Sequence, residues 1–268
     1  MEEAARSVIL DGRRIGYTLR RNPRSRGLRA VIDPDRGLLI SVPPPRRRGW
    51  AAPEPLVERF LGDRRAWVVR HLDRLERQRA AQRARGGARD GGSVRYLGEP
   101  HRVRVLAASP TIRRSTVERT GADDGDELTI RLGGPDRRQP ERVLEAWLRE
   151  RARAAIERAL ARHAAALGVA PSSVHVRDPR TRWGSASKEG RLMFSWRLIL
   201  APPDALETVV VHELAHLRVF GHGPRFWTLV AGRRPGHLAD RAWLRRHSHE
   251  LHAALETAPA AEAGTAIG

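Results

Sequence analysis

The chain has 268 residues, enough for one large domain or two smaller ones, and 40% of them are hydrophobic, which permits a buried core. It contains no cysteine, which excludes disulfides, thiolate metal ligands and a cysteine nucleophile. The formal net charge is +19, and all but one of the 50 Lys and Arg residues are arginine, a bias typical of a GC-rich genome.

Neither an export signal nor a membrane span is predicted. The first residues, Met1 to Arg6, lack a basic region leading into an apolar run. No segment approaches the roughly 18 apolar residues needed to cross a bilayer. Together with the absence of cysteine, this predicts a cytoplasmic protein without a membrane anchor.

Residues 1–136 are predicted to form a β-rich N-terminal region. Apolar or alternating runs divided by turn residues predict strands at 7–10, 15–20, 28–32, 38–42, 102–106, 116–119 and 128–132. Apolar residues at three- and four-residue spacing predict one long helix from about 55 to 83. The glycine pairs that follow predict a flexible linker at 86–92.

Residues 137–256 are predicted to form a second, more helical region. An apolar stripe predicts a helix at 140–167, ended by Gly168. A β-hairpin is expected from 174–177 and 192–200, around a turn at Trp183 and Gly184. Further helices are expected at 202–220, from 224 and at 237–255, and residues 257–268 predict a disordered tail.

The helix that begins near Pro202 contains the sequence His212-Glu213-Leu214-Ala215-His216. Residues four apart share one face of a helix, so His212 and His216 can reach one metal ion while Glu213 faces the water on it. Five residues separate His216 from His222, and a helix end at Gly221 lets His222 fold back as a third ligand. Three ligands leave the fourth position of Zn²⁺ open for water, as in a catalytic zinc site.

Two alternatives to this ligand set remain open. Histidines with this spacing can instead be core residues bonded to the backbone, with Glu213 at the surface. His222 can also merely cap the turn after Gly221. The competitors for the third position are then His237 and Asp240 in the following helix.

Four sequence blocks fall in order with short spacers between them. They are R-W-G-S-A-S at 182–187, S-W-R-L-I-L-A-P at 195–202, V-V-H-E-L-A-H-L at 210–217 and H-G-P-R-F-W at 222–227. Together they resemble the YgjP-like metallopeptidase family, which is related to the SprT and WLM zincin-like domains. The resemblance implies zinc ligands at His212, His216 and His222, with Glu213 catalytic. Ala186 stands where many relatives have cysteine, which leaves the metal site unaffected.

The elements and the motif together predict an α+β fold. Its zincin-like catalytic unit would consist of a helix, a β-hairpin and the H-E-x-x-H helix, preceded by the β-rich region. We predict a zinc metallopeptidase that hydrolyses protein or peptide substrates by a zinc-activated water, with Glu213 as general base. Arg182 and His237 are candidate donors to the developing oxyanion, and Trp183 is a candidate for lining the cleft.

The arginine excess keeps two other functions open. One is a metal-dependent phosphoanhydride (nucleotide) hydrolase, and the other is a basic module that binds nucleic acid and carries a vestigial zinc site. An intact Glu213 favours the peptidase, because a structural zinc needs no base beside its ligand. The sequence identifies neither the substrate and its cleavage site nor the oligomeric state.

Overall fold

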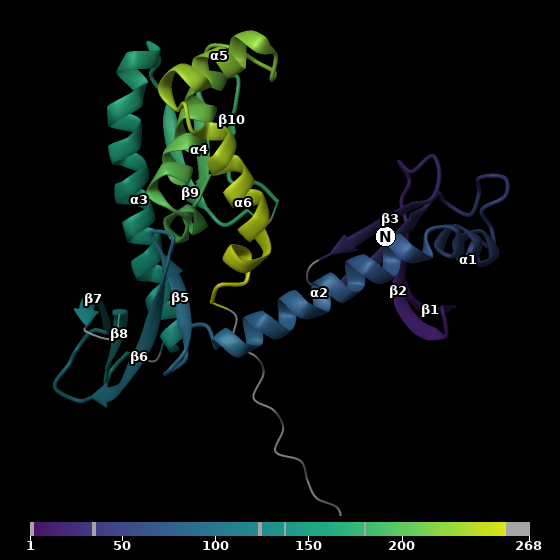
Figure 1. Ribbon diagram of the computed structural model, residues 1–268, viewed down its shortest axis with the longest axis horizontal. Coiled ribbons are helices and arrows are strands. Elements are labelled where there is room, and N and C mark those ends of the chain that lie inside the picture. The colour runs from purple at the N-terminus through teal and green to yellow at the C-terminus, as the bar shows by residue number, and fades with distance from the viewer. Residues whose placement is uncertain (1–2, 34–35, 123–124, 137, 180, 256–268) are drawn as a thin grey trace, which may run out of the picture. The chain divides into compact units, whose positions relative to one another are not determined.

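A computed structural model describes residues 3–33, 36–122, 125–136, 138–179 and 181–255 of the chain (Figure 1). These residues fall into two compact units that divide between Ala81 and Gln82. The predicted tail at 257–268 lies outside the described residues. None of the helices in the described ranges is both long and apolar enough to cross a membrane.

The N-terminal unit is a four-stranded sheet with helices packed on it. Its strands are β1 (Glu3–Leu10), β2 (Arg13–Arg21), β3 (Arg29–Asp33) and β4 (Gly37–Val42), in the order β1-β2-β4-β3. The β2–β4 pair is parallel and the two outer pairs are antiparallel. Alternate residues of β2, namely Ile15, Tyr17 and Leu19, are buried, as the period of a half-buried strand requires.

Two helices follow where the sequence predicts one from about 55 to 83. They are α1 (Glu54–Asp63) and α2 (Arg65–Arg85). The backbone leaves the helical conformation at Arg64, where φ is −112° and ψ is 18°. The break lets Val57 and Leu61 of α1 and Val68 of α2 all enter the core of the sheet, which an apolar pattern alone does not reveal.

The C-terminal unit begins with a second sheet that repeats the layout of the first. Its strands are β5 (Ser93–Tyr96), β6 (Glu99–Ser109), β7 (Thr116–Ala122) and β8 (Gly125–Gly133), in the order β5-β6-β8-β7. Again the central pair is parallel and the outer pairs are antiparallel. Val103 and Leu128 share a core with Leu144 of α3 (Pro140–Leu167), so this sheet packs with the helical region. The compact units therefore divide earlier than the predicted division at 136.

The segment predicted as a flexible linker, 86–92, forms hydrogen-bonded turns instead. The amide of Gly91 donates to the carbonyl of Val103, and the amide of Val103 donates to the carbonyl of Gly92. A Cβ at Gly92 would lie 2.3 Å from the carbonyl oxygen of Gly87, so the backbone is packed too closely there for any side chain. Gly92 therefore serves close packing, and Gly86, Gly87 and Gly91 adopt the positive φ that favours glycine.

A third sheet carries the chain toward the H-E-x-x-H helix. It consists of β9 (Ser173–Arg177), β10 (Gly184–Ala186) and β11 (Arg191–Ser195) in the order β10-β11-β9. The expected hairpin of 174–177 with 192–200 is wrong, because β9 pairs with β11 in parallel and the antiparallel partner of β11 is β10. Residues 196–200, expected to extend the strand, form the 3₁₀ helix η1 (Trp196–Leu200).

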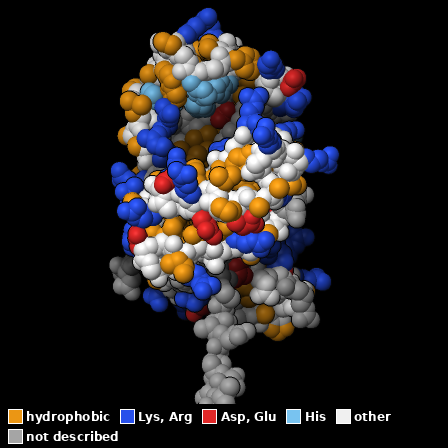
Figure 2. Space-filling view, turned by 90° about the vertical axis from the view of Figure 1, so that its right-hand side faces the viewer, with side chains coloured by type: hydrophobic (Ala, Val, Ile, Leu, Met, Phe, Trp, Pro, Cys, Tyr) orange, Lys and Arg blue, Asp and Glu red, His pale blue; other side chains and the backbone are white. Residues whose placement is uncertain are grey.

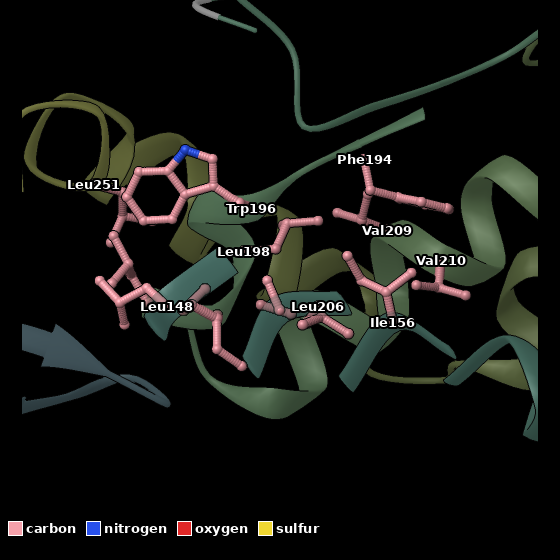
Figure 3. Close-up of a cluster of buried hydrophobic side chains, with 14 of the residues drawn as sticks. Leu148, Ile156, Phe194, Trp196, Leu198, Leu206, Val209, Val210 and Leu251 are labelled. Carbon is pink, nitrogen blue, oxygen red and sulfur yellow. The ribbon is translucent and has the colours of Figure 1, made fainter. Parts of the chain in front are cut away.

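Three helices complete the unit, and the first of them is held on several sides. They are α4 (Pro203–His216), α5 (Pro224–Arg233) and α6 (His237–His252). In Figure 1, α4 lies between α3 and α6, and it also contacts α5 and β10. Figure 3 shows the core behind it, where Val209 and Val210 meet side chains such as Ile156 of α3 and Phe194 of β11. This packing fixes α4 and confirms the α+β class.

Candidate metal centre

Three histidines converge at the end of α4. His212 and His216 lie one turn apart on the helix, and His222 follows the turn at Gly221, whose φ of 91° favours glycine. The Nε2 atom of His212 lies 3.2 Å from the Nε2 atom of His216 and 3.2 Å from that of His222. The ligating atoms of all three lie within 4.8 Å of one another.

This donor set fits a tetrahedral metal ion. Two nitrogens that each lie 2.0–2.1 Å from one zinc ion are about 3.3 Å apart at the tetrahedral angle. The two Nε2–Nε2 separations of 3.2 Å match this spacing. Within the described ranges, no other group of three or more histidine or carboxylate side chains comes together in this way.

The two competitors for the third position have other partners. Oδ2 of Asp240 accepts a hydrogen bond from Oγ1 of Thr208 at 2.5 Å and lies 3.4 Å from Arg234. His237 is buried and its ring is stacked on Trp227, with 5.5 Å between the ring centroids. Neither side chain belongs to the histidine cluster, whereas His222 does.

Aromatic side chains of α5 hold the three imidazole rings. Phe226 is fully buried and stacks on His216, with centroids 4.4 Å apart. It meets the rings of His212 and His222 edge to face, each at 4.9 Å. Nδ1 of His216 lies 3.3 Å from the carbonyl oxygen of Val219, a contact that turns Nε2 toward the cluster.

Glu213 lies in the protein interior against the first residue of β10. Its side chain is only 6% exposed. A Cβ placed on Gly184 would lie 2.7 Å from both Cγ and Oε1 of Glu213. The carboxyl group therefore fits only because position 184 has no side chain, a requirement that the sequence pattern alone does not show.

The other candidates lie outside the histidine cluster. Arg182 is exposed, and its charge opposes the rise of the Glu213 pKa. Trp183 is half-buried and stacks on His252 of α6, with centroids 4.9 Å apart. Figure 2 shows the histidines gathered beside a hollow that basic side chains border. The proposed roles of Arg182, Trp183 and His237 stay predictions.

Burial shifts the pKa of the Glu213 carboxyl group and the pKa values of the imidazoles in opposite directions. It raises the pKa of Glu213 to about 8. Burial, followed by the charges of His216 and His222, lowers the pKa of His212 to about 3. Burial also lowers the pKa of His216. Both effects disfavour the charged form, and neutral imidazole is the form that binds a metal.

These shifts predict how the stability of the metal-free protein depends on pH. Between its ordinary pKa of 4.5 and about 8, Glu213 keeps a proton in the folded protein that the unfolded chain has released. Stability must therefore fall as pH rises through this window, and the fall between pH 6.5 and 8.5 should be roughly 2 kcal/mol. His212 acts oppositely, because stability is lost as pH falls below its ordinary 6.5.

Urea unfolding of the chelator-treated protein at pH 6.5 and 8.5 measures this effect. Wild type should lose stability over the interval relative to Glu213→Gln, which has no proton to release. All other ionisable groups are common to the two proteins, so their difference isolates Glu213. If the free energy of unfolding changed equally in the two proteins between pH 6.5 and 8.5, the pKa of Glu213 would not be raised in the metal-free fold.

A helix, a hairpin and an H-E-x-x-H helix with a third histidine define a zincin-like metallopeptidase unit. The family model described as YgjP-like, metallopeptidase domain, matches residues 26–247, and the chain belongs to this family. A search of curated proteins finds no match. Among solved structures, the metallopeptidase zymogen abylysin of Pyrococcus abyssi is similar, with 22% identity and a TM-score of 0.29 over 36% of this chain and 95% of that one.

Proposed function

We propose that this metallopeptidase depends on zinc, with His212, His216 and His222 as its ligands and Glu213 as general base. The observation that carries the proposal is the convergence of three Nε2 atoms from α4 and the following loop, beside a buried carboxyl group. The family supports a peptidase with a divalent metal. The expected substrate is a peptide or a protein.

The donor chemistry favours zinc among divalent metals. Three imidazole nitrogens suit a borderline-soft ion, whereas Mg²⁺ and Ca²⁺ prefer oxygen ligands. Three protein ligands are also typical of catalytic zinc sites, because one position stays open. A bound zinc ion supplies Lewis acidity, which activates water near neutral pH and polarises a carbonyl oxygen.

Glu213 moves the proton. Burial raises the pKa of its carboxyl group in the metal-free fold, and the charge of a bound cation would favour the ionised form, which accepts a proton from the attacking water. It can then donate this proton to the amine nitrogen that leaves. Contact with the backbone of Gly184 holds the carboxyl group in place, and the positive charge of Arg182 favours its ionised form.

The position of Gly184 provides a prediction. Gly184→Ala should displace the Glu213 carboxyl, because the new Cβ would lie 2.7 Å from Oε1. We expect peptide hydrolysis to fall by about tenfold or more with zinc retained, since a misplaced base loses much of its effect. Gly232→Ala is the matched control, because a Cβ there meets no atom within 4 Å. Full activity of Gly184→Ala would mean that Glu213 can shift without cost.

Among the residues that the structure describes, no specific contact favours the alternative functions. Many arginines are paired with carboxylates; examples are Arg95 with Glu250, Arg197 with Asp178 and Arg234 with Asp204. Such pairs neutralise charge that a phosphate-binding surface would need. The nucleotide hydrolase and the nucleic-acid module therefore serve as arms of the test.

Metal analysis combined with an activity screen tests the proposal. Purified protein should contain about one zinc per chain, and the zinc-loaded form should cleave unfolded protein or peptides. Chelation should abolish cleavage and added zinc should restore it. Cleavage of nucleotides alone, or a protein that binds no zinc, would contradict the proposal.

A further inference from the structure

Arg241 of α6 lies close to the histidine cluster and has no counter-charge among the described residues. The centre of its guanidinium group lies 4.2 Å from the ring centroid of Trp227, a cation–π contact. No carboxylate among the described residues lies within 4.0 Å of it, and no hydrogen bond to them fixes it. The nearby Arg234, in contrast, pairs with Asp204, Glu207 and Asp240.

Trp227 links this arginine to the metal ligands. The indole ring lies 5.7 Å from the rings of both His212 and His222. One turn before Arg241 on α6, His237 is stacked on the same indole at an interplanar angle of 15°. Arg241 is half-buried, and its guanidinium group lies on an aromatic ring that is itself in contact with the histidine cluster.

The spacing suits a peptide bound at the metal. The distances of 4.2 Å and 5.7 Å place the guanidinium within about 10 Å of the His212 ring, which an extended peptide covers in roughly three residues. A guanidinium group stacked on a ring keeps the N–H groups at its edge free, and these can donate two parallel hydrogen bonds to a carboxylate, a bidentate contact.

We propose that Arg241 is a specificity-determining residue that binds a carboxylate of the peptide substrate, within about three residues of the bond that is cut. The proposal rests on the proposed peptidase function and adds the chemistry of the substrate. The carboxylate is either an aspartate or glutamate side chain or the C-terminal α-carboxylate. A simple packing role, in which Arg241 only covers Trp227, would give no such preference.

The test compares matched peptides rather than total activity. One peptide is neutral and has an amidated C-terminus, a second has a free C-terminus, and a third has aspartate near the cleaved bond. For wild type, kcat/KM should be roughly 10- to 100-fold higher on one of the two carboxylate-bearing peptides. Which of them is preferred identifies the source of the carboxylate.

Variants of Arg241 then show whether this residue causes the preference. Arg241→Met keeps a long side chain on Trp227 and removes the charge, so the preference should fall to about threefold or less while cleavage of the neutral peptide persists. Arg241→Glu should instead prefer a peptide with lysine in place of aspartate. Arg245→Met is the matched control, because Arg245 is exposed one turn further along α6.

Two results would contradict the proposed role of Arg241, and a third would contradict the proposed peptidase function on which it rests. Wild type that cleaves all three peptides equally has no carboxylate site. Arg241→Met and Arg241→Glu that both keep the preference would place such a site elsewhere. Zinc-loaded wild type that cleaves no peptide, neutral or acidic, would contradict the peptidase function itself, and this inference with it.

Discussion

Glu213→Gln should abolish peptide hydrolysis while leaving the zinc content unchanged. An amide has nearly the shape of the carboxylate and fits the same space against Gly184, but it cannot accept a proton. General-base catalysis contributes about 10²–10⁴-fold, so kcat should fall by at least a hundredfold. Initial rates on a peptide cleaved by wild type, with zinc measured on the same samples, provide the comparison.

Two controls accompany this variant. Its thermal unfolding with zinc should match that of wild type, which excludes a loss of fold as the cause. Glu207 lies on the same helix but outside the histidine cluster, where it pairs with Arg162, His163 and Arg234. The Glu207→Gln variant should therefore stay active. Turnover retained by Glu213→Gln would mean that another residue is the base.

His222→Ala should weaken zinc binding on the order of a thousandfold or more, because the ion would keep only two protein ligands. The fold should persist, since His222 is exposed and lies in the loop before α5. Competition with a chromophoric chelator measures the zinc affinity, and circular dichroism checks the fold. Hydrolysis should be lost at zinc concentrations that saturate wild type.

The matched control is His175→Ala. His175 is an exposed histidine of β9, where it contacts Ser173, outside the cluster. Its removal should leave zinc affinity unchanged. Wild-type affinity in His222→Ala would instead show that another side chain supplies the third ligand. Asp240 would first have to leave Thr208 and Arg234 to do so.

The metal cluster was the part of this site most accessible to sequence reasoning. His212 and His216 are four residues apart on one helix, and Gly221 marks the turn that returns His222, so the pattern is local. The contact between Gly184 and Glu213 joins segments almost thirty residues apart and leaves no periodic signal. The sequence indicates no role at the site for Phe226 or Arg241, because an apolar residue and an arginine are ordinary in any helix.

The strand pairing and the division into units also depend on contacts between segments that are distant in the sequence, and local patterns do not reveal such contacts. Adjacent strands suggested a hairpin of 174–177 with 192–200, but β10 takes the antiparallel edge of β11 and leaves β9 the parallel one. The division at 136 was expected where the predicted strands give way to predicted helices. It failed to anticipate the shared core of Val103, Leu128 and Leu144, because side-chain packing between a sheet and a later helix is invisible to local patterns.

The repeated strand order has a consequence for where mutations act in this chain. The same four-strand arrangement occurs twice, yet the first copy closes its core with α1 and α2, whereas the second merges with α3 and thereby with the helix that carries His212. None of the three clustered histidines belongs to the first copy. Mutations in the first copy therefore act on a core of its own, whereas mutations in the second copy act on a core that it shares with the helix carrying His212.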